Sequence, residues 1–138
     1  MTPQDQEFIS IPEIGQYGDC QRAVIASLLD LPIALVPHFL KEANGDTTLF
    51  WNKLQLFCGS QGFAYLTMRA TSGYRFHGLG ARVYHEIAGP SPRGNGLLHA
   101  VVGLDGKIVF DPHPSKAGLA GDPNTWEHSY LVRLGSER

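Results

Sequence analysis

The sequence has little of several features that would place it in a specialised class. It has only two cysteines among 138 residues, too few for a disulfide-stabilised scaffold. Its 11 basic and 13 acidic residues form no run of either sign, which excludes the basic surface of a nucleic-acid or anionic-lipid binder. No apolar run approaches the length of a membrane span, and residues 1–11 lack the basic start and apolar stretch of a signal peptide. We therefore expect a cytoplasmic protein that binds neither nucleic acid nor membrane.

The overall composition is that of an ordinary globular chain. With 43% hydrophobic and 17% charged residues, residues 1–138 are expected to form a single domain with one core and one main site. In a reducing compartment the two cysteines should be free thiols, and each needs its own explanation.

The first half of the chain has the apolar spacing of helices. Residues 1–18 contain prolines and glycines without a helical period and predict an irregular lead-in that packs on the surface. The helical period begins at Asp19 or Cys20 and predicts a helix with one face turned inward. A second helix is predicted over residues 33–43 with a break at Pro37, and a third after a cap at residues 46–48.

The second half changes to short segments rich in valine and isoleucine. Glycine-rich loops are expected at residues 73–80 and 89–96. The predicted strands are residues 63–68, 82–87, 97–104, 107–111 and 129–134. Helices followed by strands predict an α+β fold in which N-terminal helices pack on an antiparallel β-sheet.

Cys20 lies where a helix N-terminus would make a thiol reactive. A thiol attacks as its thiolate, and the unpaired amides and positive dipole at a helix start favour that anion. The same amides can bind an oxyanion. The alternative is that Cys20 is a small buried residue at the start of a core helix. Cys58 follows Leu54 and Phe57 late in a predicted helix, and we expect it to be an inert core thiol.

His99 and Asp111 are the candidate partners of Cys20. His99 begins an apolar strand, Asp111 ends the next one, and Asp105-Gly106 between them predicts a hairpin. A two-residue loop would pair Ala100 with Asp111 and leave His99 on the opposite face. We predict instead a three-residue bulged loop with Gly106 left-handed, which makes His99 and Asp111 direct neighbours. The alternative is an exposed hairpin in which Asp111 only starts a turn.

In this chain order, the motifs around these residues resemble the papain-like cysteine peptidase superfamily, including the peptidase domains of bacteriocin exporters. The matching segments are Gly18-Asp19-Cys20-Gln21-Arg22-Ala23, His99-Ala-Val-Val and Ile108-Val-Phe-Asp111-Pro112. The resemblance implies a papain-like fold and a Cys20, His99, Asp111 triad. It also implies an oxyanion-binding glutamine upstream of the cysteine, for which Gln16 is the candidate, four residues before Cys20 where the family usually has six.

A wider resemblance, to small uncharacterised bacterial and phage proteins, covers most of the chain. It rests on residues 18–31, Val36-Pro37-His38-Phe39 and residues 111–119. These proteins supply no known substrate, so the resemblance strengthens the fold and the triad only.

Together these observations predict a cysteine hydrolase that cleaves a peptide or isopeptide bond through an acyl-enzyme on Cys20. A resting thiolate–imidazolium pair with His99 is expected, with His113 as the next candidate base. No metal or organic cofactor is implied. The partner would be a peptide or protein substrate, with a host protein among the candidates, and residues 74–76 and 111–121 could form its rim. Three alternatives stay open: an acyltransferase, a hydrolase that acts on a non-peptide amide or a thioester, and a phage-encoded binding or inhibitor protein for a host target.

Overall fold

Local signals set the ends of the helices in the computed structural model, which describes residues 1–69 and 82–136. The three α-helices are α1 (Cys20–Leu28), α2 (Phe39–Glu42) and α3 (Thr47–Ser60). Pro37 breaks the second predicted helix as expected, leaving a 3-10 turn at Ile33–Leu35 before α2. The Asp46 carboxylate accepts a hydrogen bond of 2.8 Å from the Leu49 amide and caps α3.

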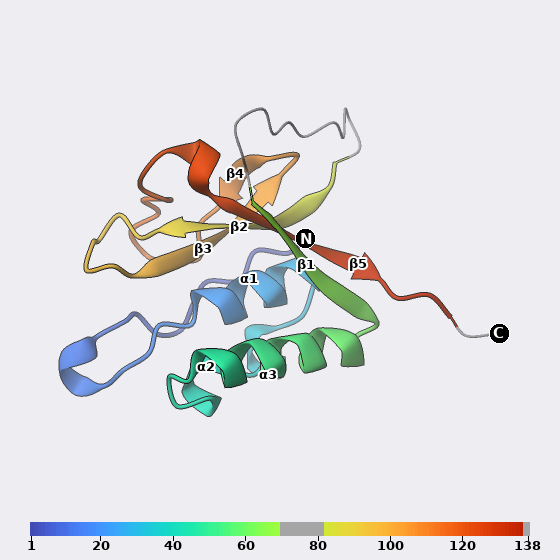
Figure 1. Ribbon diagram of the computed structural model, residues 1–138, viewed down its shortest axis with the longest axis horizontal. Helices are drawn as coiled ribbons and strands as arrows, with labels where there is room; N and C mark the ends of the chain where they lie inside the picture. The colour runs from blue at the N-terminus through green and yellow to red at the C-terminus, as the bar shows by residue number, and fades with distance from the viewer. Residues whose placement is uncertain (70–81, 137–138) are drawn as a thin grey trace.

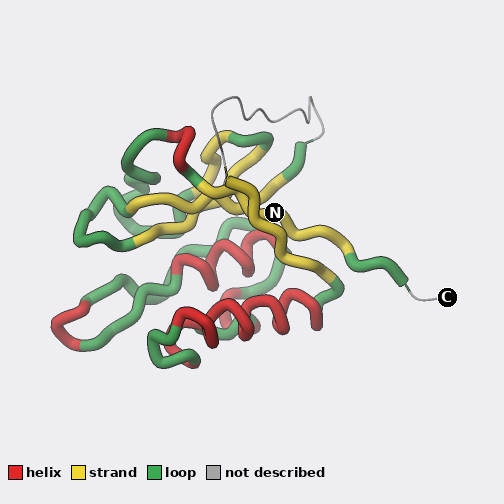
Figure 2. Tube along the Cα trace, viewed as in Figure 1, coloured by secondary structure: helices red, strands yellow, loops and turns green. Residues whose placement is uncertain are grey.

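The second half of the chain forms one antiparallel sheet, so the predicted α+β class is confirmed. Its strands are β1 (Phe63–Arg69), β2 (Tyr84–Pro90), β3 (Leu98–Leu104), β4 (Lys107–Phe110) and β5 (Glu127–Arg133). Their order is β1-β5-β2-β3-β4. The three helices lie together on one side of this sheet (Figures 1 and 2). The predicted loop at residues 73–80 and the rim at residues 74–76 lie outside the described residues.

Helix α1 is buried on more than the single face that its periodicity predicts. Five consecutive residues, 23–27, are buried. Val24 packs with Ala100 and Val102 of β3, whereas Ile25 packs with Phe39 of α2 and the core beyond it. Cys58 of α3 is fully buried in that second cluster, where a core thiol was expected. Because α1 lies between the sheet and the other helices, both of its sides are covered.

Among the described residues, no single helix is long and apolar enough to cross a membrane. The pair Cys20–Leu28 and Ile33–Glu42 meets the requirement together by length and composition alone, with a bend of 103° at the break. Much of this pair packs inside the protein.

The hairpin between β3 and β4 corrects the predicted loop. Leu104 pairs with Lys107, so the loop has two residues and the three-residue prediction is wrong. Asp105 has φ +48° and Gly106 has φ +84°. Two positive φ angles are the pattern of a type I′ turn, whose twist matches that of antiparallel strands. The left-handed conformation predicted for Gly106 is confirmed, but it belongs to this tighter turn.

A β-bulge in β4 then returns Asp111 to the face of the sheet that carries His99, which the two-residue turn alone would not do. Gly103 pairs with Ile108, but the next pair is Val102 with Phe110, which leaves Val109 as an extra residue. One extra residue sends every later side chain of that strand to the other face. Asp111 therefore emerges on the side that carries His99, although the turn alone would have separated the two residues.

Candidate functional site

A cavity of about 280 Å³ lies between the helices and the sheet. Its walls come from the N-terminal parts of the three α-helices and from β1, β2, β3 and β5. Cys20 and His99, two residues of the predicted triad, both line it. Other lining residues that bear polar groups include Gln21, His38, Tyr65 and Glu86. This placement brings a residue at a helix start and a residue at a strand start to the wall of one cavity.

Cys20 is the first residue of α1, the position that the sequence predicts. The first bond of the helix runs from the Ala23 amide to the Asp19 carbonyl at 3.0 Å, so the amides of Cys20 and Gln21 come before any helical acceptor. The backbone of Gln21 and that of Ala100 on β3 hydrogen-bond the Cys20 sulfur and favour its thiolate. The amide of Cys20 can donate to an oxyanion on a bound carbonyl group.

Burial nevertheless keeps the Cys20 thiol protonated at neutral pH. Desolvation raises its pKa from 9.0 to about 11, against the backbone hydrogen bonds that lower it, and the Glu86 carboxylate raises it further. Burial likewise lowers the pKa of His99, and the hydrogen bond to Asp111 offsets only part of that effect. No hydrogen bond joins the Cys20 thiol to the His99 ring within residues 1–69 and 82–136. These pKa directions are the opposite of those that the predicted resting thiolate–imidazolium pair requires, and they favour the neutral form of both groups.

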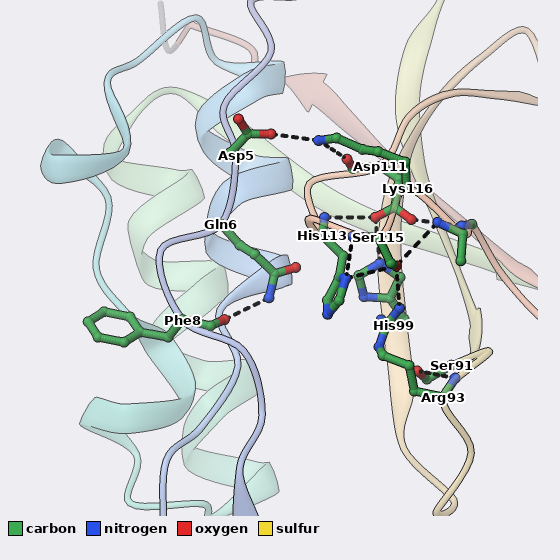
Figure 3. Close-up of polar contacts among 12 residues, drawn as sticks. Asp5, Gln6, Phe8, Ser91, Arg93, His99, Asp111, His113, Ser115 and Lys116 are labelled. Carbon is green, nitrogen blue, oxygen red and sulfur yellow. Dashed lines mark hydrogen bonds and ion pairs between the residues drawn. The ribbon is translucent and has the colours of Figure 1, made fainter.

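His99 and Asp111 form a buried hydrogen-bonded pair, with 2.7 Å between Nε2 and Oδ1 (Figure 3). Asp111 also accepts bonds from the backbone amides of His113 (2.9 Å) and Gly118 (2.7 Å). Burial alone would raise the pKa of Asp111, but these three hydrogen bonds lower it below the ordinary value. An ionised carboxylate only accepts, so His99 carries its proton on Nε2 and keeps a lone pair on Nδ1.

His38 is the second histidine on the cavity wall, and it is already engaged. Its Nδ1 accepts from the Lys41 amide at 3.3 Å, which caps α2. Its Nε2 lies 3.1 Å from the Tyr17 carbonyl and must donate to it, since a carbonyl has no proton to give. Both ring nitrogens of His38 are therefore hydrogen-bonded to backbone groups. Of the two histidines on the described wall, His99 is the one with a ring nitrogen available for proton transfer.

The structure gives Gln16 a different place from the one that the family resemblance implies. Its side-chain amide donates to the Ile9 carbonyl at 2.8 Å, and its backbone forms a bridge with Ile11. Gln16 does not line the cavity. It is therefore not positioned to bind an oxyanion formed on Cys20. His113, the second candidate base, is also absent from the cavity wall, and its Nδ1 accepts from the Ser115 amide.

The N-terminal lead-in ties the start of α1 to the loop that follows Asp111. The buried carboxylate of Asp19 accepts from the Phe8 amide at 2.9 Å and pairs with Arg22 at 3.2 Å. Two residues before Phe8, the backbone amide of Gln6 donates to the Pro112 carbonyl at 3.0 Å. Figure 3 shows this segment running past the side chains around His99. Asp19 is thus a structural residue that holds the elements of the site together.

The sequence reasoning missed a buried polar group on the cavity wall. Glu86, in the middle of β2, is 1% exposed and accepts hydrogen bonds from the Gln21 side-chain amide and the Tyr65 hydroxyl. Ser129 of β5 supplies a further hydrogen bond. Burial raises the pKa of Glu86 to about 7, although these hydrogen bonds lower it. The only sequence signal was a carboxylate inside a predicted strand, which by itself is as typical of an exposed edge.

Comparisons of the chain with protein-family models, curated proteins and solved structures found no match. Among the described residues, no group of three or more His, Cys, Asp or Glu side chains is arranged to hold a metal ion.

Proposed function

We propose that this protein is a papain-like cysteine hydrolase that cleaves a peptide or isopeptide bond through an acyl-enzyme on Cys20. One observation carries the proposal: the Asp111 carboxylate fixes the proton of His99 on Nε2, which leaves a basic Nδ1 on a residue that shares a cavity wall with Cys20. Cys20 and Cys58 are both free thiols, which fits a cytoplasmic location. The supporting geometry is that of a nucleophile, a base and a group that orients the base.

The proposed reaction needs no group outside the chain except water. As the Cys20 sulfur attacks the carbonyl carbon of the substrate, His99 Nδ1 takes the thiol proton. The C–N bond then breaks, the proton passes from His99 to the leaving amine, and a thioester remains. Water attacks that thioester, His99 accepts a proton from the water and returns it to the sulfur, and a carboxylic acid leaves. The Cys20 amide donates to the oxyanion in both halves of the reaction.

The neutral resting state assigns His99 a general-base role. Because the Cys20 thiol holds its proton at neutral pH, that proton must leave during the attack rather than before it. Asp111 contributes by stabilising the imidazolium that forms at that moment, since it is a buried ionised carboxylate in direct contact with the ring.

Acyl transfer from p-nitrophenyl acetate tests this proposal without knowledge of the natural substrate. Intact-mass spectrometry should detect one acetyl group on Cys20, formed as p-nitrophenolate is released. The adduct should be absent in Cys20→Ser and unchanged in Cys58→Ser. His99→Asn should slow its formation by about 10²- to 10⁴-fold, the usual contribution of a general base.

His38→Asn is the matched control, because it removes the other cavity histidine and retains a side chain that can cap α2. It should acylate at a rate close to that of the unmodified protein. Equal rates in the His99 and His38 variants would show that His99 is not the base. A protein that forms no acyl adduct on Cys20 would instead be a binding module, and the hydrolase proposal would be rejected.

A further inference from the structure

Glu86 is a buried carboxylate without a cationic partner. Its three hydrogen-bond donors, from Gln21, Tyr65 and Ser129, are all neutral. No lysine, arginine or histidine of the described residues forms an ion pair with it. A carboxylate accepts about four hydrogen bonds, so at least one lone pair is available for a further donor. Burying such a group without a counter-charge is unfavourable, and a ligand cation would supply what the protein lacks.

The rest of the cavity wall is suited to the same kind of ligand. A second carboxylate, Glu127, lines it from β5 and forms an ion pair of 3.1 Å with Arg69 of β1. Arg22 is the only lysine or arginine on the described wall, and its guanidinium is already held by Asp19, Glu7 and the Val36 carbonyl. Asp19 is therefore paired with Arg22 and Glu127 with Arg69, which leaves Glu86 as the carboxylate of the described wall whose charge the protein does not neutralise.

Aromatic side chains from α3 and β1 form another part of the wall. Phe50, Trp51 and Tyr65 all line the cavity. Their rings follow one another, with centroids 5.0 Å apart between Phe50 and Trp51 and 6.0 Å apart between Trp51 and Tyr65. Aromatic faces attract cations and also cover an aliphatic stem. At about 280 Å³ the cavity is near the lower end of ligand sites, which suits one side chain rather than a large molecule.

We infer that this cavity binds an amine or guanidinium group of the substrate, with Glu86 as its carboxylate partner, beside the acyl group that Cys20 attacks. The inference rests on the proposed function, because it names the class of substrate for that same site. It assigns specificity to substrates with a lysine-like or arginine-like side chain next to the bond that is cleaved.

The same contact would link recognition to catalysis. The Glu86 charge raises the pKa of the Cys20 thiol. A bound cation offsets that charge, so the thiol becomes easier to deprotonate when the correct substrate is present. Neutral substrates that enter the cavity would leave the Glu86 charge uncompensated and would react more slowly.

Binding of n-butylguanidinium to the Cys20→Ser protein tests the inference apart from the chemistry. n-Butylurea is the neutral control of similar shape. Amide chemical shifts in ¹⁵N-labelled protein at pH 8 should give a dissociation constant at least tenfold lower for the guanidinium, with the largest shifts at residues of the cavity wall. Glu86→Gln should bring the two ligands to equal affinity, whereas Glu127→Gln should retain most of the difference.

The pH dependence provides a readout in protein that still contains Glu86. The titratable groups around this carboxylate are Cys20 of α1, Cys58 of α3, Tyr65 of β1 and Glu127 of β5. The pKa values of the two thiols and the phenol are raised far above 7, so they stay neutral. Affinity for n-butylguanidinium should fall as the pH decreases through about 7 and Glu86 becomes protonated.

Three results would overturn the inference: equal affinity for the two ligands, full affinity in Glu86→Gln, or binding that does not change between pH 8 and pH 5. Because the Cys20→Ser protein cannot form an acyl-enzyme, these outcomes do not depend on the acylation experiment. Acylation without cation binding would reject the substrate class alone, and cation binding without acylation would reject the hydrolase alone.

Discussion

Cys20 should be a slow nucleophile in the unliganded protein. Its pKa of about 11 instead of 9.0 lowers the thiolate fraction at pH 8 about 100-fold, from about one in ten to about one in a thousand. Three causes raise this pKa: desolvation first, the Glu86 charge second and the Asp19 charge third. Glu86→Gln removes the second cause, so it should make Cys20 more reactive, although the burial of the thiol persists.

Iodoacetamide labelling of the Cys58→Ala protein, followed by intact-mass spectrometry from pH 7 to pH 10, measures this directly. The labelling rate of Cys20 should rise about tenfold per pH unit across the whole range, because the thiolate fraction does so well below the pKa. Glu86→Gln should shift the profile to lower pH, and Glu127→Gln, which does not contribute to the pKa of Cys20, should leave it in place. The slope of the labelling rate against pH is more informative than the absolute rate, because limited access to the partly buried thiol lowers the rate by the same factor at every pH.

A plateau of the labelling rate below pH 8 would refute this reasoning. It would mean that the thiolate is already formed at rest, which requires the ion pair with His99 that the structure does not contain. A profile unaffected by Glu86→Gln would show instead that burial alone sets the pKa of Cys20, and the proposed link between substrate charge and reactivity would fail.

Three further predictions concern stability, each measured by urea denaturation. Asp111→Asn should lower the free energy of unfolding by about 1–3 kcal/mol. The two carboxylate oxygens accept from the His99 ring, the His113 amide and the Gly118 amide, whereas an asparagine side chain has only one accepting oxygen, so at least one donor loses its partner. Unchanged stability would contradict this. Folding raises the pKa of Glu86 from 4.5 to about 7, so the folded state binds this proton more tightly than the unfolded state does. As the pH rises from 4.5 to about 7, the free energy of unfolding of the unmodified protein should therefore fall by up to about 3 kcal/mol relative to that of Glu86→Gln. Parallel pH profiles of the two proteins would exclude that linkage. Gly106→Val should cost about 1–2 kcal/mol at φ +84°, and Gly106→Asn less, because asparagine tolerates the left-handed region; equal losses would show that φ is not the cause.

The helices could be predicted because their ends depend on nearby residues. The proline at residue 37 and the cap at Asp46 each act within one turn of the helix that they limit. The same holds for the hairpin at Asp105-Gly106, whose type I′ turn follows from the positive φ angles that these residue types accept. The placement of Cys20 at a helix start follows from the apolar period that begins there.

The contact between His99 and Asp111 could be predicted only in part. The sequence indicated that both residues belong to one hairpin, but the predicted three-residue loop was wrong. The contact exists because a bulge at Val109 compensates for the shorter turn. A bulge has no required residue type, and its position depends on how Phe110 packs against Val24, Ala100 and Val102, which are distant in sequence.

The sequence by itself determined the α+β class, the start of α1 at Cys20 and the hairpin that carries His99 and Asp111, because backbone preferences act over a few residues. The tertiary structure alone decided the face on which Asp111 emerges, the burial of Glu86 beside Cys20 and the neutral resting state of the thiol. The first depends on packing between segments that are distant in sequence. The other two depend on the solvent that such segments exclude and on the charge that they supply. The pKa of Cys20 illustrates the difference: its helix position favours the thiolate, but desolvation by the surrounding chain outweighs that effect.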